Sequence, residues 1–106
     1  MTARTVFAPD AEAQARDSVA WWIRHRPAAP SLFQEALDEA VTLLERNPEA
    51  GRPYLRRGGV IVRRFLLRDV RFHVYYVYDE PQRLITVRAV WNAVRGQGPR
   101  LKPVRK

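Results

Sequence analysis

Six residues in the second half of the chain carry side chains suited to anion binding or proton transfer. They are Arg64, His73, Tyr75, Arg88, Asn92 and Arg95. A guanidinium offers a planar fork of donors to a phosphate or a carboxylate, an imidazole titrates near neutral pH, and a tyrosine ring can stack on a base. Such a set could bind a polyanion. It could also cleave RNA if a general base, a general acid and a cation met at one phosphate.

The sequence gives no support for metal or thiol chemistry. The chain has no cysteine, which excludes disulfides and thiolate nucleophiles. Its two histidines, His25 and His73, lie far apart with no cysteine, so a structural zinc site is not expected. The run "RPYLRRGG" (52–59) lacks the strand–loop–helix setting and the Gly-Lys-Ser/Thr ending of a phosphate-binding loop. We therefore expect neither a metal nor a cofactor.

The net charge of +8 is distributed unevenly along the chain. Residues 1–50 hold 5 basic and 8 acidic residues, a balance of −3, whereas residues 51–106 hold 14 basic and 3 acidic residues, a balance of +11. Arginine supplies 17 of the 19 basic residues. An acidic half followed by a basic half predicts a polyanionic partner, which could be a nucleic acid or an acidic protein segment.

A chain of 106 residues has room for one hydrophobic core, so we treat residues 1–106 as one domain that ends in a basic tail over about 97–106. No apolar run approaches the roughly 18 residues of a membrane-spanning helix. The N-terminus lacks the apolar core of a secretion signal. We therefore expect a cytoplasmic protein with no membrane partner.

The first half of the chain has helical periodicity. A strand-like run, "RTVFA" (4–8), precedes Pro9, which suits the first turn of a helix. Apolar residues at helical spacing predict a helix from about Pro9 to His25. A second amphipathic stripe predicts another helix between Ser31 and Asn47, built on Phe33, Leu37, Ala40, Val41 and Leu44. The short break between them indicates a helical hairpin.

After a loop assigned to 48–59, the hydrophobic period changes to 2. Three runs, 60–67, 72–78 and 84–91, are rich in β-branched and aromatic residues and are separated by short turns. They predict an antiparallel meander. The element order is therefore β-α-α-β-β-β, an α+β fold in which the helical hairpin packs on one face of a small antiparallel sheet.

Alternation along the strands assigns their side chains to two faces. The face beneath the helices is expected to hold the apolar set Phe65, Leu67, Phe72, Val74, Tyr76, Ile85, Val87, Ala89 and Trp91. The helix-free face is expected to gather Arg64, His73, Tyr75, Arg88 and Asn92. Arg63 has the parity of the buried set, which a bulge or a sheet edge could accommodate.

These elements and several phrases resemble the RelE/ParE superfamily of type II toxin–antitoxin toxins. The matching phrases are "FAPDAEAQ", "WW", "ALDEAVTLLERNPEAGRP", "VRRFLL", "FHVYYVYD" and "ITVRAVWNAVRGQGP", and they cover nearly the whole chain in order. The resemblance implies a small bacterial toxin that is neutralised by the C-terminal part of a co-expressed antitoxin. The stretches "HVYYVYD" and "AVWNAVRG" are more similar to ParE-like than to RelE-like members.

The resemblance implies one of two targets. RelE-like members are ribosome-dependent ribonucleases that cut mRNA, and ParE-like members inhibit DNA gyrase. Carried over from the ribonuclease branch, the basic sites of the sheet face fall on Arg64 and His73. The site at the end of the last strand falls on Asn92, which is neither an acid nor a base, and no tyrosine follows Tyr78.

The leading hypothesis is therefore a gyrase-binding toxin with no catalytic residues. In that case Arg64, His73, Tyr75, Arg88, Asn92 and Arg95 form a binding surface for the target or for the antitoxin. The alternative is an mRNA interferase with an altered site made of Arg64, His73 and Arg95. A third possibility is a decayed toxin that only binds its antitoxin. The expected antitoxin segment is acidic and amphipathic, because the toxin's basic half needs carboxylate partners.

Overall fold

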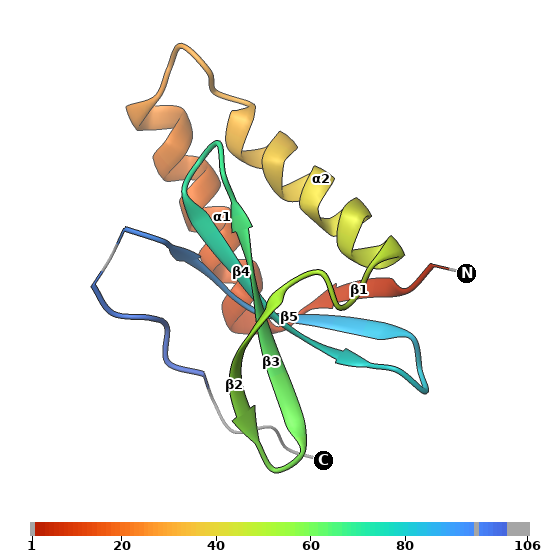
Figure 1. Cartoon of the computed structure of the whole chain (residues 1–106). Coiled ribbons are helices and arrows are strands. Elements are labelled where there is room, and N and C mark those ends of the chain that lie inside the picture. The colour runs from red at the N-terminus through yellow and green to blue at the C-terminus, as the bar shows by residue number, and fades with distance from the viewer. Residues whose placement is uncertain (1, 95, 102–106) are drawn as a thin grey trace.

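The computed structural model describes residues 2–94 and 96–101. Figure 1 shows two helices packed on a twisted sheet of five strands. In chain order the elements are β1 (Arg4–Phe7), α1 (Pro9–His25), α2 (Leu32–Arg46), β2 (Arg52–Arg57), β3 (Val60–Leu67), β4 (Phe72–Asp79) and β5 (Leu84–Asn92). The predicted α+β fold and its helical hairpin are confirmed, and the bounds of α1 are the predicted ones.

The loop prediction for residues 48–59 was wrong, because β2 lies inside it. β2 pairs antiparallel with β3 and forms an edge of the sheet. Pro53 favoured a loop prediction because proline has no N–H to donate to a neighbouring strand. An edge strand tolerates such a residue. The two strands are joined by Gly58 and Gly59, whose positive φ angles of 57° and 80° are those of a tight hairpin turn.

The sheet is mixed rather than antiparallel. Its strand order is β1-β5-β4-β3-β2, and β1 runs parallel to β5 while all the other neighbours are antiparallel. A parallel pair needs a long crossover connection. All the intervening elements provide that connection, and the first and last strands of the chain therefore lie side by side in the sheet.

The two helices cover one face of the sheet and bury the main core. Phe33 of α2 is fully buried and meets the ring of Phe72 edge-on, with 4.8 Å between the ring centroids. Trp22 of α1 donates its indole N–H to the carbonyl oxygen of Ala29 at 2.8 Å, which fixes the turn between the helices. Neither helix in the described part of the chain is long and apolar enough to cross a membrane.

A β-bulge in β5 changes the predicted faces. Tyr75 pairs with Ala89 and Tyr76 pairs with Val87, so Arg88 is the extra residue of the bulge. The assignment of Ala89 and Trp91 to the helix-covered face was therefore wrong. Both pack on the helix-free face, with Tyr75 and Val62.

The residues that alternate with them move to the opposite face. Val90 belongs to the core beneath the helices, and Asn92 pairs in register with the core residue Phe72. The prediction that Asn92 lies on the helix-free face was wrong for the same reason, because one inserted residue inverts the alternation of everything that follows it.

Candidate functional site

Four side chains meet on the helix-free face, and we refer to them as the open-face cluster: Tyr54, Arg64, His73 and Tyr75. Arg64 of β3 and Tyr75 of β4 are register partners, and His73 lies two residues before Tyr75 on the same strand. The ring centroid of Tyr75 is 4.9 Å from that of Tyr54 and 5.9 Å from that of His73. The Arg64 guanidinium carbon lies 5.1 Å from the Tyr54 ring centroid, a cation–π distance.

The predicted residues Arg64, His73 and Tyr75 are thus brought together, and Tyr54 is one that the sequence analysis missed. Tyr54 lies at the bulge of β2, between Pro53, which pairs with Arg63, and Leu55, which pairs with Val62. The available signal was the Gly58–Gly59 pair, since a two-residue glycine turn before a strand indicates a hairpin. Reading β2 as a strand would have placed a tyrosine beside Arg64.

Burial and the arginine charge both act on the titratable groups of the cluster. Burial, and then the charge of Arg64, lower the pKa of His73 below its ordinary value of 6.5. The pKa of Tyr75 is raised, mainly by burial, against the opposing effect of its hydrogen bond with Arg64. At neutral pH the cluster therefore carries a positive charge on Arg64 beside the neutral imidazole of His73 and the neutral phenol of Tyr75.

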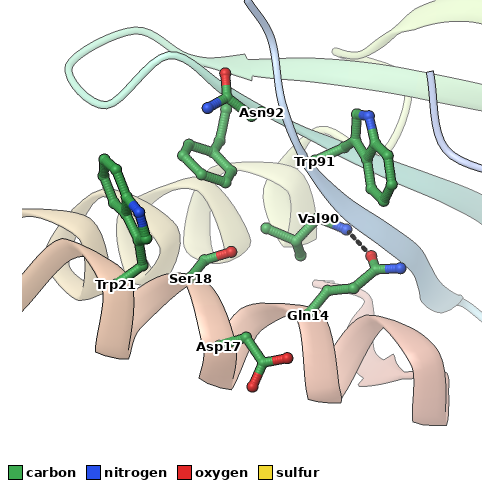
Figure 2. A pocket seen from close by; sticks show the side chains of 8 residues that line it. Gln14, Asp17, Ser18, Trp21, Val90, Trp91 and Asn92 are labelled. Atoms are coloured by element: carbon green, nitrogen blue, oxygen red, sulfur yellow. Dashed lines mark hydrogen bonds between the residues drawn. The ribbon is translucent and has the colours of Figure 1, made fainter. Parts of the chain in front are cut away.

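Asn92 lies on the other side of the sheet, beside α1. Figure 2 shows it at a cavity of about 480 Å³ that is also lined by Gln14, Asp17, Ser18 and Trp21. Its side-chain oxygen accepts the amide N–H of Val94 at 2.9 Å, so it caps the turn that ends β5. Asn92 accordingly has a local structural role and does not join the open-face cluster.

The remaining predicted site residues are placed as follows. Arg88 is the half-buried extra residue of the β5 bulge, on the strand next to β4. Arg95 lies outside the described residues. Arg63, whose parity was in doubt, turns to the sheet edge and donates to the carbonyl oxygens of Gly51 at 2.9 Å and Glu49 at 3.2 Å.

The first part of the basic tail lies over the helix-free face. The indole N–H of Trp91 donates to the carbonyl oxygen of Gln97 at 2.8 Å. Leu101 packs against the small cluster of Val62, Tyr75 and Ala89. Gly98 approaches so closely that a β-carbon there would lie 2.6 Å from the Tyr54 hydroxyl oxygen. Residues 96–101 are therefore part of the surface that surrounds the cluster.

The open-face cluster has the chemistry of a binding surface for anions and rings. Within residues 2–94 and 96–101, Arg64 forms no ion pair with a carboxylate, and His73 has no hydrogen-bonded acid or base beside it. The guanidinium instead rests on a tyrosine ring, which leaves donors available to a phosphate or a carboxylate. No group of three or more potential metal ligands exists in this described part of the chain.

Comparison with known proteins gives a family and a fold. The family model described as "ParE toxin of type II toxin-antitoxin system, parDE" matches residues 6–95. The crystal structure of the toxin–antitoxin complex RelBE2 from Mycobacterium tuberculosis contains a similar chain, with a TM-score of 0.57 and 19% sequence identity. The alignment covers 87% of this chain and 99% of that one. At this identity the structural likeness concerns the fold alone. No curated protein sequence matches the chain.

Proposed function

On the premise that the chain belongs to the ParE toxin family of type II toxin–antitoxin systems, we propose that this toxin inhibits DNA gyrase and is held inactive by a cognate antitoxin. The observation that carries the choice of gyrase is the composition of the open-face cluster. It joins one arginine to two phenols and a single imidazole, with no carboxylate and no second imidazole among the described residues of the cluster.

Cleavage of RNA by its 2′-hydroxyl needs both a group that accepts a proton and a group that protonates the leaving oxygen. His73 could do the first, because its lowered pKa keeps it neutral at pH 7. The site that the ribonuclease branch fills with a titratable residue at the end of the last strand is held here by Asn92, which is neither an acid nor a base. Asn92 also lies across the sheet, where its side-chain oxygen accepts the N–H of Val94. This separation favours binding over hydrolysis as the mode of action.

A supercoiling assay with the purified toxin tests the proposal. We expect micromolar toxin to abolish supercoiling by gyrase, with accumulation of cleaved DNA, and the Arg64→Ala variant to inhibit less. Arg46→Ala, an exposed change at the end of α2, is the control with the same loss of charge. Full supercoiling activity and no cleaved DNA in the presence of the wild-type toxin would contradict gyrase inhibition.

The second candidate is a ribosome-dependent mRNA interferase, which is supported by the neutral His73 on the same face as Arg64. Toxin-dependent cuts in ribosome-bound mRNA that disappear in His73→Ala and Arg64→Ala would establish it. Intact transcripts would exclude it. If expression without the antitoxin leaves growth unaffected, the chain is a decayed toxin that only binds its antitoxin.

The antitoxin is proposed to be an acidic amphipathic segment. A groove of about 660 Å³ along α1 and α2 has an apolar floor of Phe7, Ala15, Val19, Ile23 and Leu37, which suits the apolar side of a helix, and is also lined by Glu12, Arg16 and Asp17. Arg16 at this groove and exposed arginines elsewhere on the toxin would pair with its carboxylates. Binding should weaken as salt increases, and an affinity that is equal at low and high salt would contradict the electrostatic part.

A further inference from the structure

The β2–β3 hairpin is strongly basic. Residues 50–68 contain six arginines and no aspartate or glutamate. Figure 1 shows the turn of this hairpin at the opposite end of the molecule from the turn between α1 and α2. The tip of the hairpin, which carries Arg56 and Arg57, therefore lies well away from the turn between the helices.

The tip of the hairpin is narrow and has arginines on both faces. Nothing lies within 4 Å of a β-carbon built at Gly58 or Gly59. Arg57 pairs with Val60 and therefore shares the helix-free face with the Leu55–Val62 pair, whereas Arg56 pairs with Ile61 and faces the other side. Both arginines are exposed. The tip is therefore a narrow two-stranded ribbon with Arg57 on one face and Arg56 on the other.

The positive charges of the hairpin are not neutralised within the described protein. Arg52 and Arg64 are register partners across the two strands, and like charges placed opposite one another destabilise a sheet. None of the hairpin arginines forms an ion pair with a described carboxylate. The Arg64 guanidinium lies over the Tyr54 ring, and the Arg63 guanidinium donates hydrogen bonds to the carbonyl oxygens of Glu49 and Gly51. An anion from outside would relieve the repulsion between Arg52 and Arg64.

We propose that the β2–β3 hairpin binds the phosphate backbone of duplex DNA, with Arg52, Arg56, Arg57 and Arg64 as its phosphate contacts. The major groove of B-DNA admits a two-stranded ribbon between its two phosphate backbones, which matches arginines that point to both sides of the tip. The biological setting rests on the proposed function, since an inhibitor of gyrase meets its target together with DNA. DNA contact would then increase the affinity of the toxin for the gyrase–DNA complex.

An acidic antitoxin segment fits this surface less well than DNA does. An amphipathic partner needs apolar anchors as well as carboxylate sites. The large apolar side chains exposed in the described protein are Val6, Trp21, Ile23, Leu43, Tyr54, Leu66 and Val94, and none of them lies in the tip residues Arg56–Gly59. The tip offers charge without apolar surface, which is what a phosphate backbone requires.

Binding of the purified, antitoxin-free toxin to a short fluorescent DNA duplex, followed by anisotropy over a salt series, tests the proposal. Wild-type toxin should bind in the range of about 1–100 µM at physiological salt and more tightly at low salt, as sequence-independent contacts do. The Arg56→Gln/Arg57→Gln variant should bind roughly tenfold more weakly and reduce the slope of log K against log salt by about 2. The Arg24→Gln/Arg46→Gln variant, with the same charge change at exposed helix positions, should retain the wild-type slope.

Three results would overturn the proposal. They are the absence of duplex binding by the wild type, an equal loss of affinity in the hairpin and helix variants, and tighter binding of single-stranded RNA than of duplex DNA of equal length. The supercoiling assay on the same proteins separates this proposal from the proposed function. Gyrase inhibition without duplex binding removes only the hairpin proposal, and duplex binding without gyrase inhibition removes only the choice of target.

Discussion

Gly51 donates its backbone N–H to the hydroxyl oxygen of Tyr76 at 2.8 Å, across 25 positions of the sequence. The same hydroxyl donates to the carbonyl oxygen of Pro48 at 2.7 Å. Tyr76 itself is completely buried in the core beneath the helices. The centre of the sheet thus anchors the turn that leads from α2 into β2, and β2 carries Tyr54 to the open-face cluster. This hydroxyl therefore links the core to the segment that carries Tyr54 into the open-face cluster.

Tyr76→Phe should reduce the free energy of unfolding by about 1–3 kcal/mol, because it leaves the buried N–H of Gly51 without its acceptor. Urea denaturation measures the change. Tyr78→Phe is the matched control, because no hydrogen bond of the Tyr78 hydroxyl is present in the described structure, and its effect should stay within about 0.5 kcal/mol. Equal effects of the two substitutions would show that the contact of Tyr76 with the turn adds no stability.

Gly51 and Gly98 approach tyrosine hydroxyls equally closely, yet we expect substitution by alanine to reduce the stability of the fold by different amounts. A β-carbon at Gly51 would lie 2.6 Å from the hydroxyl oxygen of Tyr76, and one at Gly98 would lie 2.6 Å from that of Tyr54. Tyr76 is fully buried and cannot move aside, whereas Tyr54 is 40% exposed and can rotate outward. Gly51→Ala should therefore destabilise by about 1–3 kcal/mol, and Gly98→Ala by less than about 0.5 kcal/mol. Thermal or urea unfolding of both variants compares them, and a costlier Gly98→Ala would contradict the argument.

The helices and most of the sheet were predictable because their signals are local. The apolar stripe of α2 and the proline at the start of α1 each lie within one element, so sequence spacing alone indicates them. β2 was missed because Pro53 reads as a loop residue unless the strand is known to form an edge of the sheet. Edge position is a property of the whole sheet, and no single segment of the sequence contains it.

The composition of the site was harder to predict than the fold because it depends on two bulges. The bulge at Arg88 inverts the alternation of β5, so that Trp91 and not Asn92 lies on the helix-free face. The bulge at Tyr54 adds a tyrosine ring to that face. Period-2 alternation assumes that no residue is inserted. Arg64, His73 and Tyr75 were assigned to the correct face of the sheet because β3 and β4 pair without interruption over residues 62–67 and 72–77.

The end of β5 is protected by a side chain of α1. β1 pairs with β5 only up to Val87, and beyond that point the Gln14 side-chain oxygen accepts the N–H of Val90 at 2.8 Å (Figure 2). Gln14→Met keeps a similar volume and removes the acceptor. Hydrogen exchange of the Val90 amide should accelerate, and stability should fall by about 1–2 kcal/mol. The exposed substitution Gln34→Met is the control, and unchanged exchange at Val90 would argue against the protective contact.

The environment of His73 should make the stability of the fold depend on pH. Because burial and Arg64 lower the pKa of His73, the unfolded chain binds a proton to this group at higher pH than the folded one does. Stability should therefore be complete above about 6.5, the ordinary pKa, and should decrease as the pH falls from there toward the folded value. His73→Gln should remove this part of the pH dependence in urea denaturation series.

An NMR titration of the His73 ring separates the two causes of its lowered pKa. Arg64→Gln removes the nearby charge but leaves most of the burial, so the pKa of His73 should rise only part of the way toward 6.5. Arg57→Gln, a loss of the same charge at the tip of the same hairpin, should move it less, since Coulomb interactions weaken with distance and screening. If both variants shift the titration equally, then the general charge of the hairpin acts on His73. A shift confined to Arg64→Gln would assign the effect to the contact within the open-face cluster.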